Sequence, residues 1–475
     1  MARFRRVLLL LSGLILAVVL LFVLFVGPWP VYRDSRFRDT AYYREALQAI
    51  DLAAAHTGIS SAEGPLRAGW GVRKITPEPG KPMGGYGARP NDKKSTGVHD
   101  PLFVKAVAVT DGQDTVVIVG ADLLQTLPNL VERVEAGLAE KMASPPPPIF
   151  YTTSHTHCGP GGLAPGVAAR ISYGEYDPEL VEMLASRYVE AILDAVGSME
   201  SARFAHDSLD GAPYVVNRSR EAEVDGHLDF AVFEKPSGSR CVMVRFSAHP
   251  TIYPEEMLAF SAEYPGVLQQ RVHEKTGAEC VYLGGAVGSM GPRPPEGDQP
   301  DEQVRAMGGA LGDRVASALT GALNWTDTAD VAALASTFGV PPLQARPVSA
   351  SWRLSPFMAR VFGVLPEGRL QAARIGRLLL CGMPYDFSGE VSVRWRAMAR
   401  EKGYDLWVTS HSGAYLGYLS PDRYYWLLGP EYSYDHNYEI GLMNWFGPNQ
   451  EAYMTDLFAR AMDRLIPPTV TAAGS

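Results

Sequence analysis

The chain has 475 residues, of which 46% are apolar and 20% are charged, and its formal net charge is −9. This length suits one large catalytic domain or two or three smaller ones, and the composition is that of a globular protein. An acidic body without a basic run would repel phosphates, which argues against nucleic acid as a partner. The four cysteines form no C-x-x-C pair, so a thiolate zinc site is not expected, whereas one or two disulfides are left open.

Residues 1–35 predict a membrane anchor. Val7 to Val26 is a run of 20 residues without a charge, and as a helix it would span about 30 Å, the thickness of the hydrocarbon core. Arg3, Arg5 and Arg6 precede the run and favour a cytoplasmic N-terminus. A cleaved signal peptide is the alternative, but the apolar run is too long and no small-x-small site follows it. We therefore expect an uncleaved single-pass anchor, with the remaining chain on the non-cytoplasmic side.

Apolar periodicity predicts the elements that follow. Residues 36–65 are expected to form a stalk or linker with a short helix over Thr40–His56, residues 66–467 a single large domain, and residues 468–475 a polar tail. The predicted fold class is α/β, with mixed β-sheets flanked by helices. Expected strands are 103–111, 114–122, 149–154, 230–233, 241–247, 280–283, 378–381 and 406–410, and expected helices are 128–142, 178–196, 303–323 and 449–465.

Two histidines stand at the end of one predicted strand. Thr152 to Gly162 reads T-T-S-H-T-H-C-G-P-G-G, so His155 and His157 lie where the strand 149–154 runs into a glycine-rich turn. Imidazole is a preferred ligand of zinc, and α/β sheets usually bind ligands at the carboxyl ends of their strands. A pair of ordinary strand histidines is the alternative, but the small polar and glycine-rich flanks favour a functional site.

Four more segments carry candidate functional side chains. Taken singly, each has a commonplace explanation as a loop histidine, a charge at a helix N-terminus, a core tyrosine or a surface arginine. Their joint occurrence with the histidine pair favours one shared site. The residues are His249 in Phe246–Thr251, Glu390 in Met383–Glu390, Tyr418 in Ala414–Leu419, and Arg218 in Val216–Ser219.

Taken in chain order, the segments resemble those of the neutral/alkaline non-lysosomal ceramidases, and the resemblance extends from about Leu66 to about Pro467. The pair matches that family's S/T-H-T-H-S-G-P-G-G core, with Cys158 in place of the serine. Other matches are N-R-S, A-x-H-P-T, G-E after a strand, and Y-x-x-Y. Carried over residue by residue, the resemblance implies that the zinc ligands are His155, His249, Glu390 and Tyr418.

The resemblance also implies roles for the remaining residues. His157 would be a supporting or proton-transfer histidine, and Arg218 a substrate or oxyanion contact. Two imidazoles and a carboxylate leave zinc an open position for the water that attacks an amide. The chain departs from the family's G-D-V-S-P loop, because Gly291 stands at the position of the serine and only Ser289, two residues earlier, offers a hydroxyl. The C-terminal immunoglobulin-like domain of typical ceramidases is not expected here.

These observations predict a zinc-dependent hydrolase of an N-acyl amide, ceramidase-like in converting ceramide and water to a sphingoid base and a fatty acid. Its partners would be a lipid or another amide substrate, and the membrane through the N-terminal helix; the oligomeric state is left open. Two alternatives remain at this stage. One is a related zinc amidase or esterase acting on another cell-envelope metabolite, and the other is an inactive binding protein, because the family serine is absent.

Overall fold

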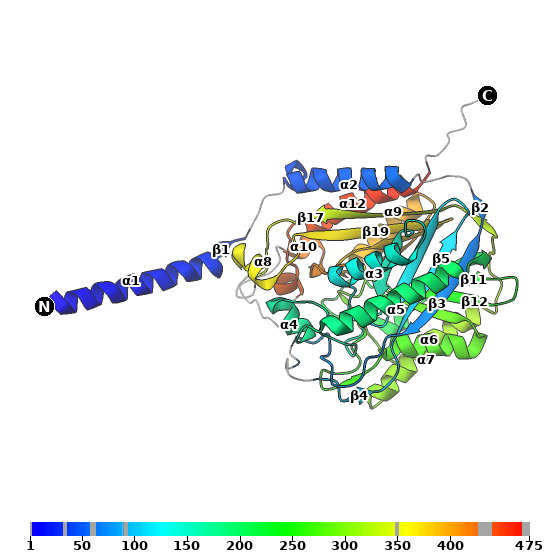
Figure 1. Cartoon of the computed structure of the whole chain (residues 1–475), viewed down its shortest axis with the longest axis horizontal. Helices are drawn as coiled ribbons and strands as arrows, with labels where there is room; N and C mark the ends of the chain where they lie inside the picture. Colours follow the sequence, from blue (N-terminus) through cyan, green and yellow to red (C-terminus); the bar gives the residue numbers. More distant parts are fainter. Residues whose placement is uncertain are drawn as a thin grey trace, which may run out of the picture.

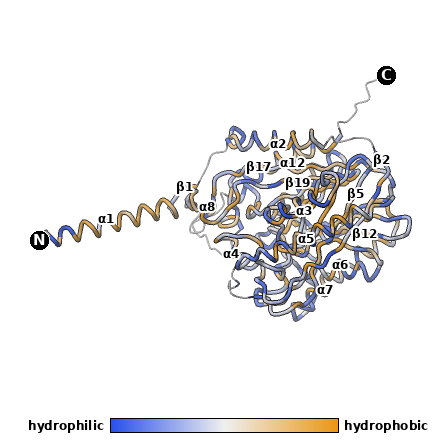
Figure 2. The backbone as a smooth tube through the Cα atoms, in the orientation of Figure 1, coloured by the Kyte–Doolittle hydropathy of each residue, from blue (hydrophilic) through white to orange (hydrophobic). Residues whose placement is uncertain are grey.

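The computed structural model describes residues 2–31, 36–57, 63–87, 89, 94–346, 351–425 and 439–467. Helix α1 (Ala2–Phe25) projects from a rounded body and is exposed along its length (Figure 1). Over Arg3–Phe25 it is long and apolar enough to cross a membrane, as its colouring in Figure 2 indicates. It could be a membrane anchor or a signal sequence, because both meet this description.

Three large sheets form the body. The first has the order β7-β6-β5-β3-β8, the second β14-β12-β11-β9, and the third β17-β19-β20-β22. Their strands are β3 (Arg67–Lys74), β5 (Phe103–Thr110), β6 (Thr115–Ala121), β7 (Ile149–Thr153), β8 (Glu200–Ser201), β9 (Arg203–Asp210), β11 (His227–Glu234), β12 (Arg240–Phe246), β14 (Glu279–Gly284), β17 (Val331–Gly339), β19 (Glu367–Ile375), β20 (Leu378–Gly382) and β22 (Asp405–Thr409).

The inner faces of all three sheets share one apolar core. Because side chains alternate along a strand, one set points inward and the other outward. The inward set includes Ile118 from the first sheet, Met243 and Leu283 from the second, and Ala373 and Leu380 from the third, all in one buried cluster. Burial of apolar surface stabilises a protein by about 25 cal/mol per Å². Because the three sheets bury their inner faces against one another, this free energy favours one orientation of the sheets.

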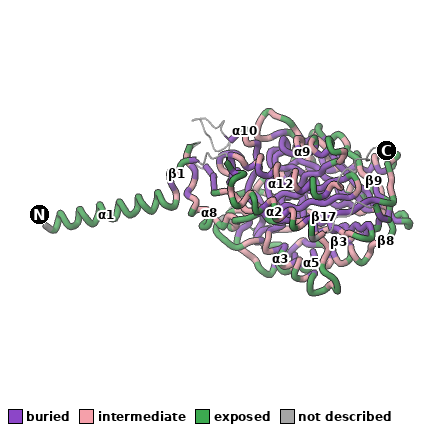
Figure 3. Tube along the Cα trace, turned by 90° about the horizontal axis from the view of Figure 1, so that it is seen from above, coloured by how far each residue is buried: buried purple, intermediate pink, exposed green. Residues whose placement is uncertain are grey.

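Helices cover the outer faces of the sheets (Figures 1 and 3). The first sheet is covered by α3 and α5, the second by α6 and α7, and the third by α2, α9 and α12. Helix α2, predicted as a short helix within a stalk or linker, packs on β17 and α12 of the domain. The helices span α2 (Ala41–Thr57), α3 (Pro128–Lys141), α5 (Pro178–Gly197), α6 (Glu263–Thr276), α7 (Pro300–Ala318), α9 (Gly389–Glu401) and α12 (Gln450–Leu465).

Smaller elements connect these layers. The two-stranded pairs are β1 (Trp29–Pro30) with β18 (Trp352–Arg353), β10 (Val215–Asn217) with β15 (Met290–Pro292), β13 (Ala259–Phe260) with β4 (Gly97–Val98), β16 (Thr328–Ala329) with β2 (Gly64–Pro65), and β21 (Asp386–Phe387) with β23 (Tyr418–Leu419). The short helices are η1 (Phe37–Asp39), α4 (Val167–Tyr173), η2 (Ala212–Tyr214), α8 (Phe357–Phe362), α10 (Asp422–Tyr425) and η3 (Glu439–Met443).

Each large sheet contains one parallel strand pair, namely β6 with β7, β12 with β14, and β20 with β22. The carboxyl ends of these pairs meet. A Cβ at Gly284, the last residue of β14, would lie 2.4 Å from the carbonyl oxygen of Thr153 at the end of β7. The backbone N–H of Ser410, the first residue after β22, donates to the carbonyl oxygen of the same Gly284 at 3.2 Å. Glycine at position 284 allows the strand ends to approach.

The predicted fold class, mixed β-sheets flanked by helices after one apolar N-terminal helix, is confirmed. Strands β17 and β19 and helices α6 and α9 were not predicted. All four cysteines are buried and free, so the disulfides left open by the sequence do not form. The predicted tail, residues 468–475, and residues 58–62 of the linker lie outside the described residues.

Candidate metal and catalytic site

Four functional side chains follow the carboxyl ends of the parallel strands. His155 comes two residues after β7, His249 three after β12, Asp386 four after β20, and His411 two after β22. Three of them are 0 to 2% exposed and His155 is 3% exposed. His155 and His411 have positive φ angles of 64° and 58°, which non-glycine residues adopt at a cost. The backbone turns sharply after β7 and β22, and both turns bring an imidazole inward.

Hydrogen bonds orient two of the imidazoles. His155 Nδ1 lies 2.8 Å from the carbonyl oxygen of Leu124, and His249 Nδ1 lies 3.1 Å from that of Val287. A carbonyl can only accept, so each Nδ1 carries the proton and each Nε2 lone pair is available to a metal. His157 Nε2 lies 3.3 Å from His155 Nε2 and 2.8 Å from His249 Nε2. The three Nε2 atoms therefore face a common point.

Asp386 supplies a carboxylate at the same place. Its Oδ1 lies 3.4 Å from His155 Nε2 and 3.1 Å from His411 Nε2. Its Oδ2 accepts a 2.8 Å hydrogen bond from the Tyr415 hydroxyl. Two groups among the described residues could thus hold a metal ion, one made of His155, His157 and His249, and one made of His155, Asp386 and His411.

Ring geometry decides which side chains can share one metal. The rings of His155 and His249 are inclined by 79° with centroids 4.5 Å apart, so their in-plane lone pairs can converge. The rings of His155 and His411 are stacked, with centroids 3.9 Å apart and planes only 7° apart. Nearly parallel planes direct the two lone pairs alongside each other, and they cannot converge on a metal about 2 Å from each nitrogen. Ring geometry thus favours His155 with His249 over His155 with His411, and Asp386 is the carboxylate beside that pair, with its Oδ1 facing His155 Nε2.

His411 serves to hold the other two groups in place. Its ring stacks on His155, and its Nε2 reaches the Asp386 oxygen that also faces His155. Hydrogen-bonded partners of this kind fix the orientation of metal-binding side chains. Neither His411 nor Asp386 was singled out from the sequence. The available signal was their distance from a strand end, two and four residues, compared with eight residues for Glu390.

Burial keeps the histidines in the metal-binding form. It lowers the pKa of His155 and His249 well below the ordinary value and that of His157 to about 3. Burial alone would raise the pKa of Asp386, but the adjacent His411 and His155 hold it below its ordinary value. The imidazoles are therefore neutral and the carboxylate is ionised across the physiological range of pH.

Arg218 and Tyr418 lie together beside the histidines. The Arg218 guanidinium donates to the carbonyl oxygen of Gly288 at 2.9 Å and to the Tyr418 hydroxyl at 3.2 Å. Tyr418 pairs with Asp386 across the parallel strands β23 and β21. The positive charge of Arg218 is also a cause of the lowered pKa of His249. Of the four residues expected to bind zinc, His155, His249 and Tyr418 are thus near Asp386 or one another.

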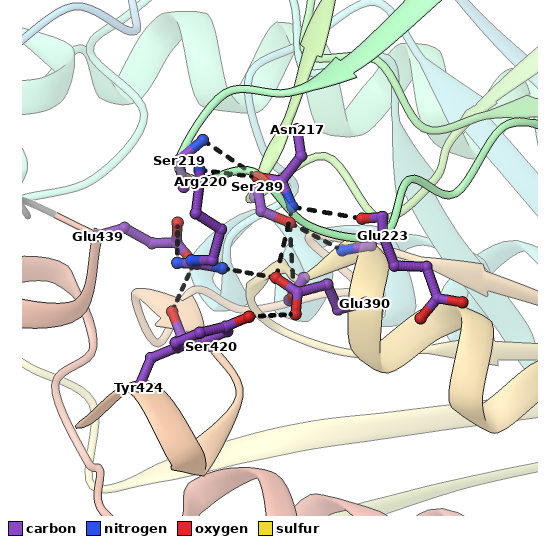
Figure 4. Close-up of polar contacts among 12 residues, drawn as sticks. Asn217, Ser219, Arg220, Glu223, Ser289, Glu390, Ser420, Tyr424 and Glu439 are labelled. Atoms are coloured by element: carbon purple, nitrogen blue, oxygen red, sulfur yellow. Dashed lines mark hydrogen bonds and ion pairs between the residues drawn. The ribbon is translucent and has the colours of Figure 1, made fainter. Parts of the chain in front are cut away.

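Glu390 takes part in a different cluster, drawn in Figure 4. Its carboxylate is fully buried and accepts hydrogen bonds from Arg220 at 2.8 Å, Tyr424 at 3.0 Å and Asn217 at 3.4 Å, and it also pairs with Arg423. Arg220 bridges to Glu439 at 3.0 Å. Glu390 is in neither of the two candidate metal groups among the described residues. Its interactions instead secure the Asn217–Arg220 loop that carries Arg218.

Ser289, Gly291 and Cys158, the remaining residues discussed from the sequence, are buried or packed against neighbouring residues. The Ser289 hydroxyl is buried, 3.3 Å from Ser388 Oγ, and accepts from the backbone N–H of Gly389 at 3.1 Å, where helix α9 begins. A Cβ at Gly291 would lie 3.2 Å from the Cβ of Arg218. Burial raises the pKa of the Cys158 thiol to about 12, so this residue is an apolar filler and not a nucleophile.

Comparisons with known proteins agree with this architecture. Residues 67–262 match the family model described as neutral/alkaline non-lysosomal ceramidase, N-terminal. The crystal structure of neutral ceramidase from Pseudomonas aeruginosa is similar with a TM-score of 0.72 at 18% identity, covering 86% of this chain and 76% of that one. A structure of a ceramidase complexed with C2 has a TM-score of 0.70 at 18% identity, covering 86% and 78%. No curated protein matches this chain. The resemblance inferred from the motifs is confirmed.

The first prediction separates the two carboxylates. Asp386→Asn should abolish metal binding, because among the described residues Asp386 is the carboxylate that belongs to the candidate metal groups. Glu390→Gln should keep the metal, about one ion per chain as in the wild type. The measurement is bound zinc after dialysis of the folded full-chain protein, with folding checked by circular dichroism. Retention by Asp386→Asn together with loss by Glu390→Gln would reinstate Glu390 as the ligand.

The second prediction concerns pH. A metal site made of ordinary histidines loses about tenfold in affinity per pH unit for each imidazole once the pH falls below about 6.5, because protons compete. Here the pKa of each imidazole is lowered, so its proton does not compete until the solution is more acidic. Zinc affinity, measured by chelator competition, should stay level between about pH 7.5 and 5.5. A decline that begins near 6.5 would contradict the neutral, buried state of these rings.

The third prediction tests His411. His411→Asn preserves a residue type that tolerates positive φ but removes the ring that stacks on His155. Zinc affinity should fall by about 10- to 100-fold. The control is His206→Asn, which alters a histidine bonded to Asp405 on β22. Equal zinc affinity in the two variants would show that His411 does not position the site.

Proposed function

We propose that this chain, whose residues 67–262 match the neutral/alkaline ceramidase family model, is a zinc-dependent hydrolase of an N-acyl amide. The observation that carries the proposal is the convergence of two imidazoles and one carboxylate from three different sheets. All three side chains are buried, the Nε2 lone pairs of His155 and His249 are available to a metal, and Asp386 Oδ1 lies 3.4 Å from His155 Nε2.

The donor set supports zinc as the metal. Two imidazole nitrogens and one carboxylate oxygen are typical of catalytic zinc sites, which keep a further position for water or substrate. Tyr418 is proposed as an additional oxygen ligand, because its strand pairs with that of Asp386. When bound, zinc would supply Lewis acidity and lower the pKa of a bound water to about 7.

His157 is proposed as the group that moves the proton. Its Nε2 faces the Nε2 atoms of His155 and His249. His157 is partly exposed to solvent, so it borders the opening of the site. The lowered pKa leaves the imidazole unprotonated and able to accept a proton from water. The same nitrogen can then donate that proton to the leaving amine, which would otherwise depart as a strong base.

Arg218 is proposed to stabilise the negative charge that develops on the amide oxygen. Its guanidinium is held by the Gly288 carbonyl and lies beside Tyr418, so it is oriented before substrate arrives. Preoriented donors of this kind act in the transition state without a reorganisation cost. Ser289 is occupied by the Gly389 N–H, and Gly291 has no hydroxyl. Water, rather than a serine, is therefore the proposed nucleophile.

The proposed substrate is a ceramide-type lipid. The family match and the two similar structures, both described as ceramidases, support this choice over other amides. The proposed location is the membrane, with α1 as an uncleaved anchor and the catalytic domain on the non-cytoplasmic side, since Arg3, Arg5 and Arg6 precede the apolar run.

Contacts at the end of α1 support an anchor over a cleaved signal. Strand β1, four residues after α1, pairs with β18 of the domain. The Trp29 indole N–H donates to the Val23 carbonyl at 2.7 Å, and the Ser355 N–H donates to the Val26 carbonyl at 3.3 Å. A chain cleaved just after α1 would lose these contacts between helix and domain.

The fourth prediction tests the reaction. The full-chain protein with zinc should release fatty acid from a fluorescent ceramide faster than from N-acyl amino acids or matched esters. His157→Gln should retain zinc but lose about 10² to 10⁴ in kcat, because a general acid–base group is removed. The matched control is His227→Gln, since His227 is bonded to Asp225 in another part of the fold.

The alternatives give different results in that assay. Preference for an ester or an N-acyl amino acid would identify another zinc hydrolase. Zinc-loaded wild-type protein that releases no acyl chain from any of these substrates would identify a binding protein and overturn the proposed activity.

A further inference from the structure

We propose that α4 and α8 form a membrane-docking surface that sets the opening of the catalytic site against the lipid bilayer into which α1 inserts. This inference rests on the proposed membrane anchor and names the partner of that face, a lipid surface. Its support comes from how α1 is joined to the domain, from where apolar side chains are exposed, and from the short connection between α4 and His157.

The end of α1 is attached firmly to the domain beside α8. The Ser355 hydroxyl donates to the Leu24 carbonyl, and the Phe25 ring contacts the Phe357 ring with centroids 6.3 Å apart. The Arg353 guanidinium donates to the Pro30 carbonyl at 2.7 Å. These contacts fix the direction in which α1 leaves the body (Figure 1). A membrane crossed by α1 must therefore meet the part of the domain that surrounds its C-terminal end.

Exposed apolar side chains gather at that part. Outside α1, seven large apolar residues are exposed among the described residues, and four of them lie on α4 and α8. They are Val167 and Ile171 on α4, and Phe357 and Val361 on α8, with exposures of 59, 46, 45 and 46%. The two helices pack against each other, and α8 also contacts α1. Helices α4 and α8 thus lie next to the C-terminal end of the apolar helix (Figure 1).

The composition of the two helices suits a lipid interface. Each is short and carries one exposed arginine among apolar residues, Arg170 on α4 and Arg360 on α8. Apolar side chains gain by entering the boundary between headgroups and acyl chains, and arginine is attracted to anionic headgroups. In water the same apolar side chains would stay exposed without compensation.

Helix α4 also borders the catalytic site. The Ser172 carbonyl on α4 accepts from the Gly85 N–H at 3.0 Å. A Cβ at Gly85 would lie 2.7 Å from His157 Nδ1, so a single backbone segment separates α4 from the proposed proton-transfer histidine. The Tyr86 ring packs on His157 at 4.7 Å. With α4 on the bilayer, a lipid amide would reach the histidines from the membrane without crossing bulk water.

A labelling experiment on the full chain in phosphatidylcholine–phosphatidylglycerol nanodiscs tests this. All four native cysteines are buried, so one added surface cysteine carries the fluorophore, with unmodified protein as the labelling blank. Probes at Ile171→Cys and Val361→Cys should shift to shorter wavelength and be quenched by spin-labelled lipid. The matched control is Leu52→Cys, an apolar residue 53% exposed on α2, which should show neither change.

A probe at Leu16→Cys within α1 separates the two levels of the proposal. Quenching at Leu16 without quenching at Ile171 and Val361 leaves the anchor intact and overturns the docking surface. Absence of quenching at Leu16 overturns the anchor, and the docking surface with it. Quenching at Leu16, Ile171 and Val361, with none at Leu52, supports both.

A substrate comparison adds an independent measure. The double variant Ile171→Asp/Val361→Asp should hydrolyse long-chain ceramide in vesicles about tenfold or more slowly, yet hydrolyse a water-soluble short-chain ceramide at the wild-type rate. Leu52→Asp should match wild type on both. Equal loss on both substrates would overturn a docking role. If wild type hydrolyses neither substrate, the proposed activity fails, whereas the fluorescence result still decides the docking surface.

Discussion

Packing of three sheets around one shared core is the constraint on which the rest of this molecule depends. Each sheet contributes one parallel strand pair, and the carboxyl ends of the three pairs meet around Gly284, where the absence of a side chain lets the backbones approach. His155, His249 and Asp386 each come from a different sheet, so no single sheet could assemble the site. Loss of packing between any two sheets would separate these candidate ligands, which would couple metal binding at this site to the stability of the whole body.

Burial of charge at this meeting point is balanced locally. An ionised carboxylate without water would be costly, but Asp386 lies against two imidazoles and the Tyr415 hydroxyl. Glu390 is balanced in a similar manner by Arg220 and Arg423 in the neighbouring cluster. The carboxylate of Asp386, together with the imidazole lone pairs, forms an electron-rich point that suits a cation. The carboxylate of Glu390 is neutralised by arginines and supports the loop that carries Arg218.

Much of this architecture could be predicted from the sequence, since strands 103–111, 114–122 and 149–154 and the two longest predicted helices of the body follow clear apolar periods. Histidines at strand ends were also recognisable. The position of Asp386, rather than Glu390, beside the histidines was not, because it depends on how far a loop runs after β20 before α9 begins. His411 has no local motif, and its role arises only from stacking on a residue 256 positions earlier. Likewise, β17 and β19 were missed because they are recognisable mainly through their place in the third sheet.

The four cysteines have a consequence for how the protein matures. Each thiol is buried and unpaired, and burial raises its pKa well above the ordinary value, so none is in the reactive thiolate form. Because none of the four thiols is paired, no disulfide holds the domain together. The candidate site therefore forms without a covalent cross-link, and neither oxidants nor disulfide isomerases are required for it.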